Sequence, residues 1–283
     1  MKDLAAHFEF GRNWSGYAQL IDADRIDQAV RGLERLAGRS TIEGNTFLDI
    51  GCGSGLHSLS ALRLGAGRVM AIDLDPHSVA TARQVLSQYA PDKDWDIREQ
   101  SVFDLDPQQL GEFDVVYAWG SLHHTGAMYD AWNRAAKMVA PGGILIVAVY
   151  RKTRLCRLWK LEKRIYTNSP MWIQHCLRAV FVGAMRIAFF LTRRDFRKYR
   201  ESYGQAYRGM NYDHDVHDWL GGYPYESISP PEADQFRESL GFAPVRAFVE
   251  ERTRVGLFGS GNDEYVWQRS APSTAQCQAG RSS

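Results

Sequence analysis

The sequence predicts an α/β fold, a seven-stranded, mostly parallel, doubly wound sheet with a helical insertion after strand five. The segment Asp49-Ile-Gly-Cys-Gly-Ser-Gly55 follows an apolar run and precedes a helical pattern. This order is typical of a buried parallel strand that breaks into a glycine turn at a helix N-terminus. Short apolar strands then alternate with helical patterns up to residue 150. Such alternation predicts βαβ units and a mostly parallel sheet.

Start and stop signals place the helices in order. Asp75-Pro76 supplies an N-cap and a proline at the first helical position, and the helix over 128–139 ends before Pro141-Gly142-Gly143. Ser229-Pro-Pro-Glu232 is a capping box that begins a short helix ending at Leu240. The expected strands cover residues 47–49, 68–72, 95–101, 113–119, 144–150, 245–252 and 264–268.

The glycine spacing discriminates between ligands. A nicotinamide-binding turn reads Gly-x-Gly-x-x-Gly and would need a glycine at position 56, which is leucine here. No phosphate-binding Gly-Lys-Ser/Thr element is present in the sequence. An acid inside the turn repels a phosphate and suits a cationic amino-acid moiety. Asp73 ends the second strand, where an acid grips the ribose hydroxyls of an adenosine.

These motifs, with Leu122-His-His124 at a strand end and the turn at 141–143, resemble the class I S-adenosylmethionine-dependent methyltransferases over roughly residues 45–150. The core is similar to the ubiquinone-pathway O-methyltransferases, although the long insertion departs from their pattern. The resemblance implies S-adenosylmethionine as the cofactor and one group of binding residues. These are Asp49, Gly51, Gly53 and Gly55 at the methionine end, Asp73 at the ribose, Leu74, Ser101 and Val102 around the adenine, and Trp119 beside the sulfonium.

The expected organisation is an N-terminal helical and aromatic arm (1–40), a cofactor-binding core (41–150), a basic and apolar helical cap insertion (151–226), core completion (227–269) and a disordered tail (270–283). Trp14 and Tyr17 of the arm are second-tier contacts or packing residues. The four cysteines include no Cys-x-x-Cys pair, and no signal-peptide pattern is present at the N-terminus. The expected location is therefore the cytoplasm.

The insertion concentrates positive charge. Residues 151–200 hold 14 basic and two acidic side chains, although the whole chain has a net charge of +1. Within this segment, residues 171–191 are nearly all apolar. A buried or lid helix over the active site is the favoured interpretation, and an interfacial helix on an anionic membrane is the second. A transmembrane span is disfavoured because Arg178 and Arg186 lie well inside the segment.

Two groups of side chains are candidates for removing a proton from the acceptor. His123 and His124 follow strand four, at the edge of the sheet where ligands bind. His214, Asp218 and Glu226 lie in an aromatic, acidic stretch of the insertion between two glycine-containing turns. His214 and Asp218 would share a helix face, but a third and fourth ligand at set spacing are missing, so no metal is expected.

The predicted function is methyl transfer to a small molecule or to a lipid- or glycan-linked acceptor. Oxygen is favoured over nitrogen as the acceptor atom. Peripheral contact with an anionic membrane at the inner face, through residues 151–200, is an additional possibility. Two alternatives stay open: a tRNA-modifying methyltransferase that uses the basic segment as its RNA surface, and a non-catalytic cofactor-binding partner protein. Nucleic acid is the less favoured partner, because supporting motifs are missing.

Overall fold

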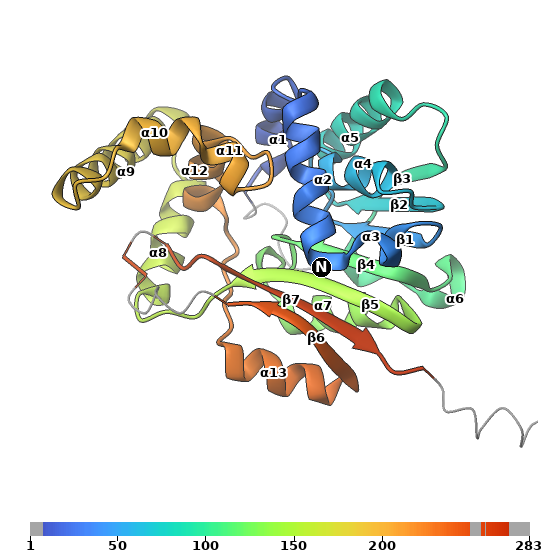
Figure 1. Ribbon diagram of the computed structural model, residues 1–283. Coiled ribbons are helices and arrows are strands. Elements are labelled where there is room, and N and C mark those ends of the chain that lie inside the picture. Colours follow the sequence, from blue (N-terminus) through green and yellow to red (C-terminus); the bar gives the residue numbers. More distant parts are fainter. Residues whose placement is uncertain (1–7, 250–255, 258, 272–283) are drawn as a thin grey trace, which may run out of the picture.

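A seven-stranded sheet lies at the centre of the described part of the chain (Figure 1). This computed structural model describes residues 8–249, 256–257 and 259–271. The strand order is β3-β2-β1-β4-β5-β7-β6, and β7 alone runs antiparallel to both of its neighbours among these strands. The strands are β1 (Thr46–Ile50), β2 (Arg68–Asp73), β3 (Trp95–Glu99), β4 (Phe113–Trp119), β5 (Val139–Tyr150), β6 (Phe242–Phe248) and β7 (Asn262–Arg269). The predicted fold class is confirmed.

Helices cover both faces of the sheet and continue into an arm at one side (Figure 1). They are α1 (Phe10–Ala18), α2 (Ala23–Ala37), α3 (Arg39–Ile42), α4 (Leu56–Arg63), α5 (Pro76–Tyr89), α6 (Pro107–Leu110), α7 (Met128–Lys137), α8 (Cys156–Thr167), α9 (Met171–Leu191), α10 (Phe196–Glu201), α11 (Tyr203–Ala206), α12 (Tyr212–Gly221) and α13 (Pro230–Ser239). Alternation along β1 sends Phe47 into the apolar core under α2, α4 and α5, and Leu48 into the core under α7 and α13.

The predicted helix starts are confirmed. The Asp75 carboxylate accepts a hydrogen bond of 2.8 Å from the backbone N–H of His77, and Ser229 and Glu232 form the capping box of α13. The strand limits differ mainly at three places. β5 begins at Val139 and not at residue 144, since Val139 already pairs with Phe113 of β4. β3 ends at Glu99, because the chain turns into a short 3₁₀ helix at Val102–Asp104. β6 begins earlier than predicted, at the buried Phe242. Its predicted end at 252, and most of the predicted disordered tail, lie outside the described residues.

Helices α8 to α12 fall within the predicted insertion, between β5 and α13. α8 and α12 pack together, with hydrogen bonds from Tyr166 to His217 and from Thr167 to the Gly221 carbonyl. α9 and α10 project away from the sheet (Figure 1). The favoured interpretation was a buried or lid helix over the active site. None of the 21 residues of α9 is buried, so the buried form of that prediction is wrong, and the lid form stays a prediction. Hydropathy revealed an apolar segment, but it could not show what covers it.

Candidate active site

A cavity of about 1700 Å³ opens beyond the carboxyl ends of β1, β2 and β4. This is the edge at which ligands bind in open α/β sheets. Its floor comes from the turns after these strands. Its walls come from α1, from the insertion and from the segment before β7. It therefore joins a region near the glycine turn to a second region under the insertion.

The glycine turn lies on the cavity wall with its backbone in the left-handed region. Gly51 and Gly53 have φ angles of +74° and +55°. A Cβ on Gly51 would lie 2.5 Å from the Cβ of Ser121, and one on Gly53 would lie 2.9 Å from the Trp14 ring. Side chains are excluded at both positions, so backbone groups face the cavity here. Trp14 thus covers the turn from the N-terminal arm.

Asp73 ends β2 and supports the same turn. Its carboxylate accepts hydrogen bonds of 2.9 Å from the backbone N–H groups of Gly53 and Asp75. The remaining lone pairs of the carboxylate, on the cavity wall, can accept bonds from a ligand hydroxyl. Burial raises the pKa of Asp73 to about 6. The group is therefore largely ionised at neutral pH.

Apolar and polar side chains flank this acid along the floor. Leu74 is exposed on the cavity side, and Ser101 and Val102 lie at the end of β3. The Ser101 hydroxyl caps the 3₁₀ helix Val102–Asp104 by accepting a 3.2 Å hydrogen bond from the backbone N–H of Phe103. Gln100 lines the cavity beside them and was not predicted. This strip can hold a planar ring between apolar side chains.

The guanidinium of Arg208 is buried against the ring of Trp119. The indole N–H donates to Glu264 over 2.8 Å, and the guanidinium carbon of Arg208 lies 3.3 Å from the ring centroid. Nη1 of Arg208 donates to the Tyr117 hydroxyl over 3.2 Å. Arg208 forms no ion pair with a carboxylate among the described residues. A buried guanidinium of this kind on a cavity wall can bind an anionic ligand group.

Comparison with known proteins agrees with this geometry. Residues 48–147 match the model of a family described as "Methyltransferase domain". Over 121 residues the chain is 38% identical to the ubiquinone biosynthesis O-methyltransferase of Xanthomonas campestris pv. campestris strain B100, an alignment that covers 43% of this chain and 49% of the relative. The corresponding protein of Xanthomonas axonopodis pv. citri strain 306 is 39% identical over the same length. The chain thus spans about half the length of the curated relatives it matches.

The fold is shared with solved methyltransferases. The magnesium protoporphyrin IX methyltransferase of Synechocystis PCC 6803, solved with bound SAH, superposes with a TM-score of 0.52 at 16% identity, covering 90% of this chain and 84% of that one. An O-methyltransferase family protein from Burkholderia thailandensis gives a TM-score of 0.51 at 17% identity, covering 86% and 56%. Residues 48–147 thus match a methyltransferase domain, and the described chain shares its fold with solved methyltransferases. Enzymes of this family use S-adenosylmethionine as the methyl donor.

The cavity of the methyltransferase domain fits that donor by its chemistry. Asp73 can accept bonds from a ribose diol, and the floor beside Leu74 and Val102 can hold a purine. At the amino-acid end of the donor, the open backbone of the glycine turn suits the ammonium group, and the Arg208 guanidinium suits the carboxylate.

Two of the predicted donor contacts lie off the cavity wall. Asp49 is buried on the α4 side of β1, where its carboxylate accepts a 2.6 Å hydrogen bond from Ser58. Gly55 faces α5, and a Cβ there would lie 2.9 Å from that of Ala82. Strand alternation and helix packing thus point both residues away from the cavity, and their contact with a ligand stays a prediction. Both residues support the turn from behind.

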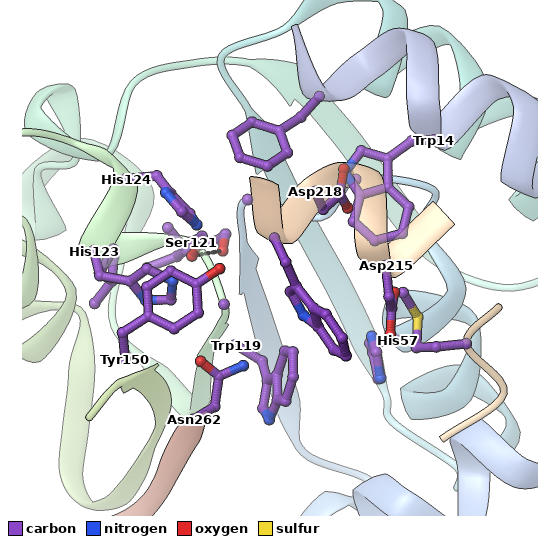
Figure 2. A pocket seen from close by; sticks show the side chains of 18 of the residues that line it. Trp14, His57, Trp119, Ser121, His123, His124, Tyr150, Asp215, Asp218 and Asn262 are labelled. Carbon is purple, nitrogen blue, oxygen red and sulfur yellow. Dashed lines mark hydrogen bonds between the residues drawn. The ribbon is translucent and has the colours of Figure 1, made fainter. Parts of the chain in front are cut away.

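His123, His124, Tyr150 and Ser121 gather on one side of the cavity, across from His57 (Figure 2). Nδ1 of His124 lies 2.9 Å from the Pro224 carbonyl, which can only accept. Nδ1 therefore carries the proton, and Nε2 is the basic nitrogen of the neutral ring. His123 is buried, and its Nδ1 has no hydrogen-bond partner among the described residues. Burial lowers the pKa of His123, as do the neighbouring His124 and Lys163, so it stays neutral.

Of the second candidate group, His214, Asp218 and Glu226, only Asp218 lines the cavity. Asp218 lines the cavity, with its carboxyl group 2.7 Å from the Asn13 amide. Burial, with Asp215 nearby, raises the pKa of Asp218 well above its usual range, which favours its protonated form. His214 lies off the cavity wall, and its Nδ1 bonds to Asn13 Oδ1 over 2.6 Å.

Glu226 and Tyr17 also lie off the cavity wall. The Glu226 carboxylate accepts a 2.9 Å bond from the backbone N–H of Met128 and so caps α7. The Tyr17 hydroxyl donates to the Gly209 carbonyl inside the core. These groups hold helices and loops in place, as does His214. Tyr17 is thus a packing residue, whereas the catalytic roles of His214 and Glu226 stay predictions.

Sequence reasoning missed the residues that the insertion contributes. Lys163 of α8 is buried against the cavity, and its Nζ lies 5.5–5.8 Å from the ring centres of Tyr150, Trp159 and Tyr225. Burial lowers the pKa of Lys163 to about 8. The one signal for Arg208 was its place in an Arg-Gly-Met stretch of unusual composition. Across the described ranges, no group of three or more His, Cys, Asp or Glu side chains is placed to hold a metal ion.

Proposed function

We propose that this protein transfers a methyl group from S-adenosylmethionine to the oxygen of a small-molecule or a lipid- or glycan-linked acceptor. The observation that carries the proposal is the joined cavity. One end has the glycine turn and Asp73, and the other end is walled by aromatic side chains of the arm and the insertion. A single space of this size holds a donor and an acceptor together, which methyl transfer requires.

Bound at the glycine turn, the donor supplies an electrophilic methyl group on a sulfonium. Asp73 would hold the ribose hydroxyls, and Arg208 would hold the carboxylate of the amino-acid end. Trp119 lines the cavity with the Arg208 guanidinium stacked on its ring, so the ring holds that cation in place on the wall. Trp14 covers the turn and excludes water from it.

Oxygen is the proposed acceptor atom because the site offers a base for a hydroxyl. Nε2 of His124 would take the proton, with the Pro224 carbonyl holding the ring in the required tautomer. His123 is the second candidate base, since its ring is neutral and its Nδ1 has no hydrogen-bond partner among the described residues. The named O-methyltransferase relatives support oxygen over the part of the core that they share.

We propose a cytoplasmic enzyme that meets its acceptor at the inner face of the membrane. The segment 151–200, with 14 basic and two acidic residues, supports this location. α9 alone, among the described helices, is long and apolar enough to cross a membrane by length and composition.

Transfer of label tests the activity. The purified protein is incubated with methyl-tritiated S-adenosylmethionine and either an aqueous or a lipid extract of cells. Label should enter one extract with the wild type and stay at background with Asp73→Ala. If the wild type binds S-adenosylhomocysteine but labels neither extract, the protein is a non-catalytic binder and the proposal fails.

A further inference from the structure

Helix α9 exposes a row of large apolar side chains along its whole length. Trp172, Val180, Ile187 and Phe190 are each between 62% and 81% exposed. Their spacings of eight, seven and three residues place them on one helix face at 3.6 residues per turn. Soluble monomers rarely leave so large an apolar surface uncovered, and such patches mark interaction sites.

The opposite side of α9 is held by the protein. Leu177, Phe181 and Val182 pack against the apolar core, and α9 contacts α8, α10 and α12. The helix is thus apolar on both sides, but only one side has a partner in the described chain. A transmembrane orientation would break this packing and bring Arg178 and Arg186 into hydrocarbon. The attached helix can instead lie along a surface.

Exposed basic side chains lie close in sequence to the apolar rows of α8 and α9. α8 has a second exposed apolar row, Leu158, Leu161 and Ile165, with Arg157 and Arg164 next to it in the sequence. α9 is followed by the exposed residues Arg193, Arg194, Arg197 and Lys198. This combination is complementary to an anionic bilayer, which offers negative headgroups above an apolar layer. Nucleic acid would satisfy the basic residues but not the apolar row.

We propose that α9 docks on an anionic phospholipid bilayer, with its exposed apolar row in the interfacial layer. The insertion also reaches the active site, because Met185 of α9, Tyr199 and Tyr207 line the cavity. An acceptor held in the membrane would therefore enter the cavity from the side of the insertion. This last step rests on the proposed methyltransferase function, whereas the docking itself does not.

Vesicle co-sedimentation tests the docking. Wild-type protein should pellet with vesicles of phosphatidylcholine and phosphatidylglycerol, and much less with phosphatidylcholine alone. The variant Trp172→Ser/Ile187→Ser/Phe190→Ser should lose about tenfold or more in partitioning, since binding scales with buried apolar area. A control variant, Leu20→Ser/Val245→Ser, removes exposed apolar side chains outside helices α8 to α12 and should pellet like the wild type. The three α9 side chains are exposed, so the variant should retain the wild-type Tm.

Three results would overturn the inference: wild-type protein that ignores anionic vesicles, unchanged partitioning of the α9 variant, or a wild-type dimer that the variant converts to a monomer. Affinity for S-adenosylhomocysteine, measured on the same preparations, separates the two proposals. Intact S-adenosylhomocysteine binding without vesicle binding rejects only the docking. Vesicle binding without S-adenosylhomocysteine affinity rejects only the methyltransferase function.

Discussion

At the scale of single residues, Asp73 connects the glycine turn to the proposed donor. Asp73→Ala removes the charged acceptor for the ribose hydroxyls. The affinity for S-adenosylhomocysteine should fall about tenfold or more, because charge-assisted hydrogen bonds contribute about 1.5–3 kcal/mol. Titration calorimetry measures the change. Asp92→Ala, an exposed acid outside the cavity, is the control. Equal affinities of wild type and Asp73→Ala would contradict the ribose assignment.

The same carboxyl predicts a pH dependence. Burial raises the pKa of Asp73 to about 6, and a ligand hydroxyl needs the ionised form as its acceptor. Affinity for S-adenosylhomocysteine should therefore be constant above this pH and fall as pH decreases through it, approaching about tenfold per pH unit. Asp73→Asn should flatten the profile. A wild-type profile without a bend, or an unchanged bend in Asp73→Asn, would assign the effect to another group.

Arg208 is the residue whose role the structure reveals most directly. Its guanidinium is buried on the Trp119 ring without a carboxylate partner in the described residues. Arg208→Gln should weaken S-adenosylhomocysteine about tenfold or more. It should leave 5′-methylthioadenosine unaffected, because that compound lacks the amino-acid end. Calorimetry with both ligands provides the comparison. Equal losses for both would show that Arg208 acts on the fold of the site instead.

At the scale of elements, Asn13 connects the N-terminal helix to the insertion. From α1 its amide donates to Asp218 and to the His214 carbonyl and accepts from the His214 ring. Asn13→Ala should lower the free energy of unfolding by about 1–3 kcal/mol, because buried partners are left unsatisfied. Thermal denaturation should show this as a lower Tm.

The exposed Asn168 provides a matched control for this substitution. Its amide bonds only to a carbonyl within its own helix, so Asn168→Ala should have little effect. If the two variants melt at the same temperature, the contact between α1 and α12 does not stabilise the fold.

Elements could be predicted where local pattern and burial agree. The strands of the core are apolar runs with turn residues on both sides, and the caps at Asp75 and Ser229 formed as predicted. The apolar pattern of α9 predicted a helix correctly, but it also predicted burial. Whether an apolar helix is covered depends on distant segments and on partners, and neither is encoded in its own periodicity.

At the scale of the whole molecule, the two ends of the site differ in how far sequence could reveal them. The donor end is built from turns that follow consecutive strands, so a contiguous motif identified Asp73 and the glycine turn. The acceptor end is assembled from α1, α8 and loops of the insertion. Lys163 at the acceptor end and Arg208 at the donor end come from segments without a fixed spacing to the motif. The same distance hid the contacts by which His214 and Glu226 support helices.

The central claim is that the turn around Cys52 binds an adenosyl amino acid and not a dinucleotide. Titration calorimetry of the wild-type protein with S-adenosylhomocysteine and with NADH tests this most directly. The account predicts saturable one-to-one binding of S-adenosylhomocysteine and no heat of binding for NADH. Saturable binding of NADH with no response to S-adenosylhomocysteine would contradict it.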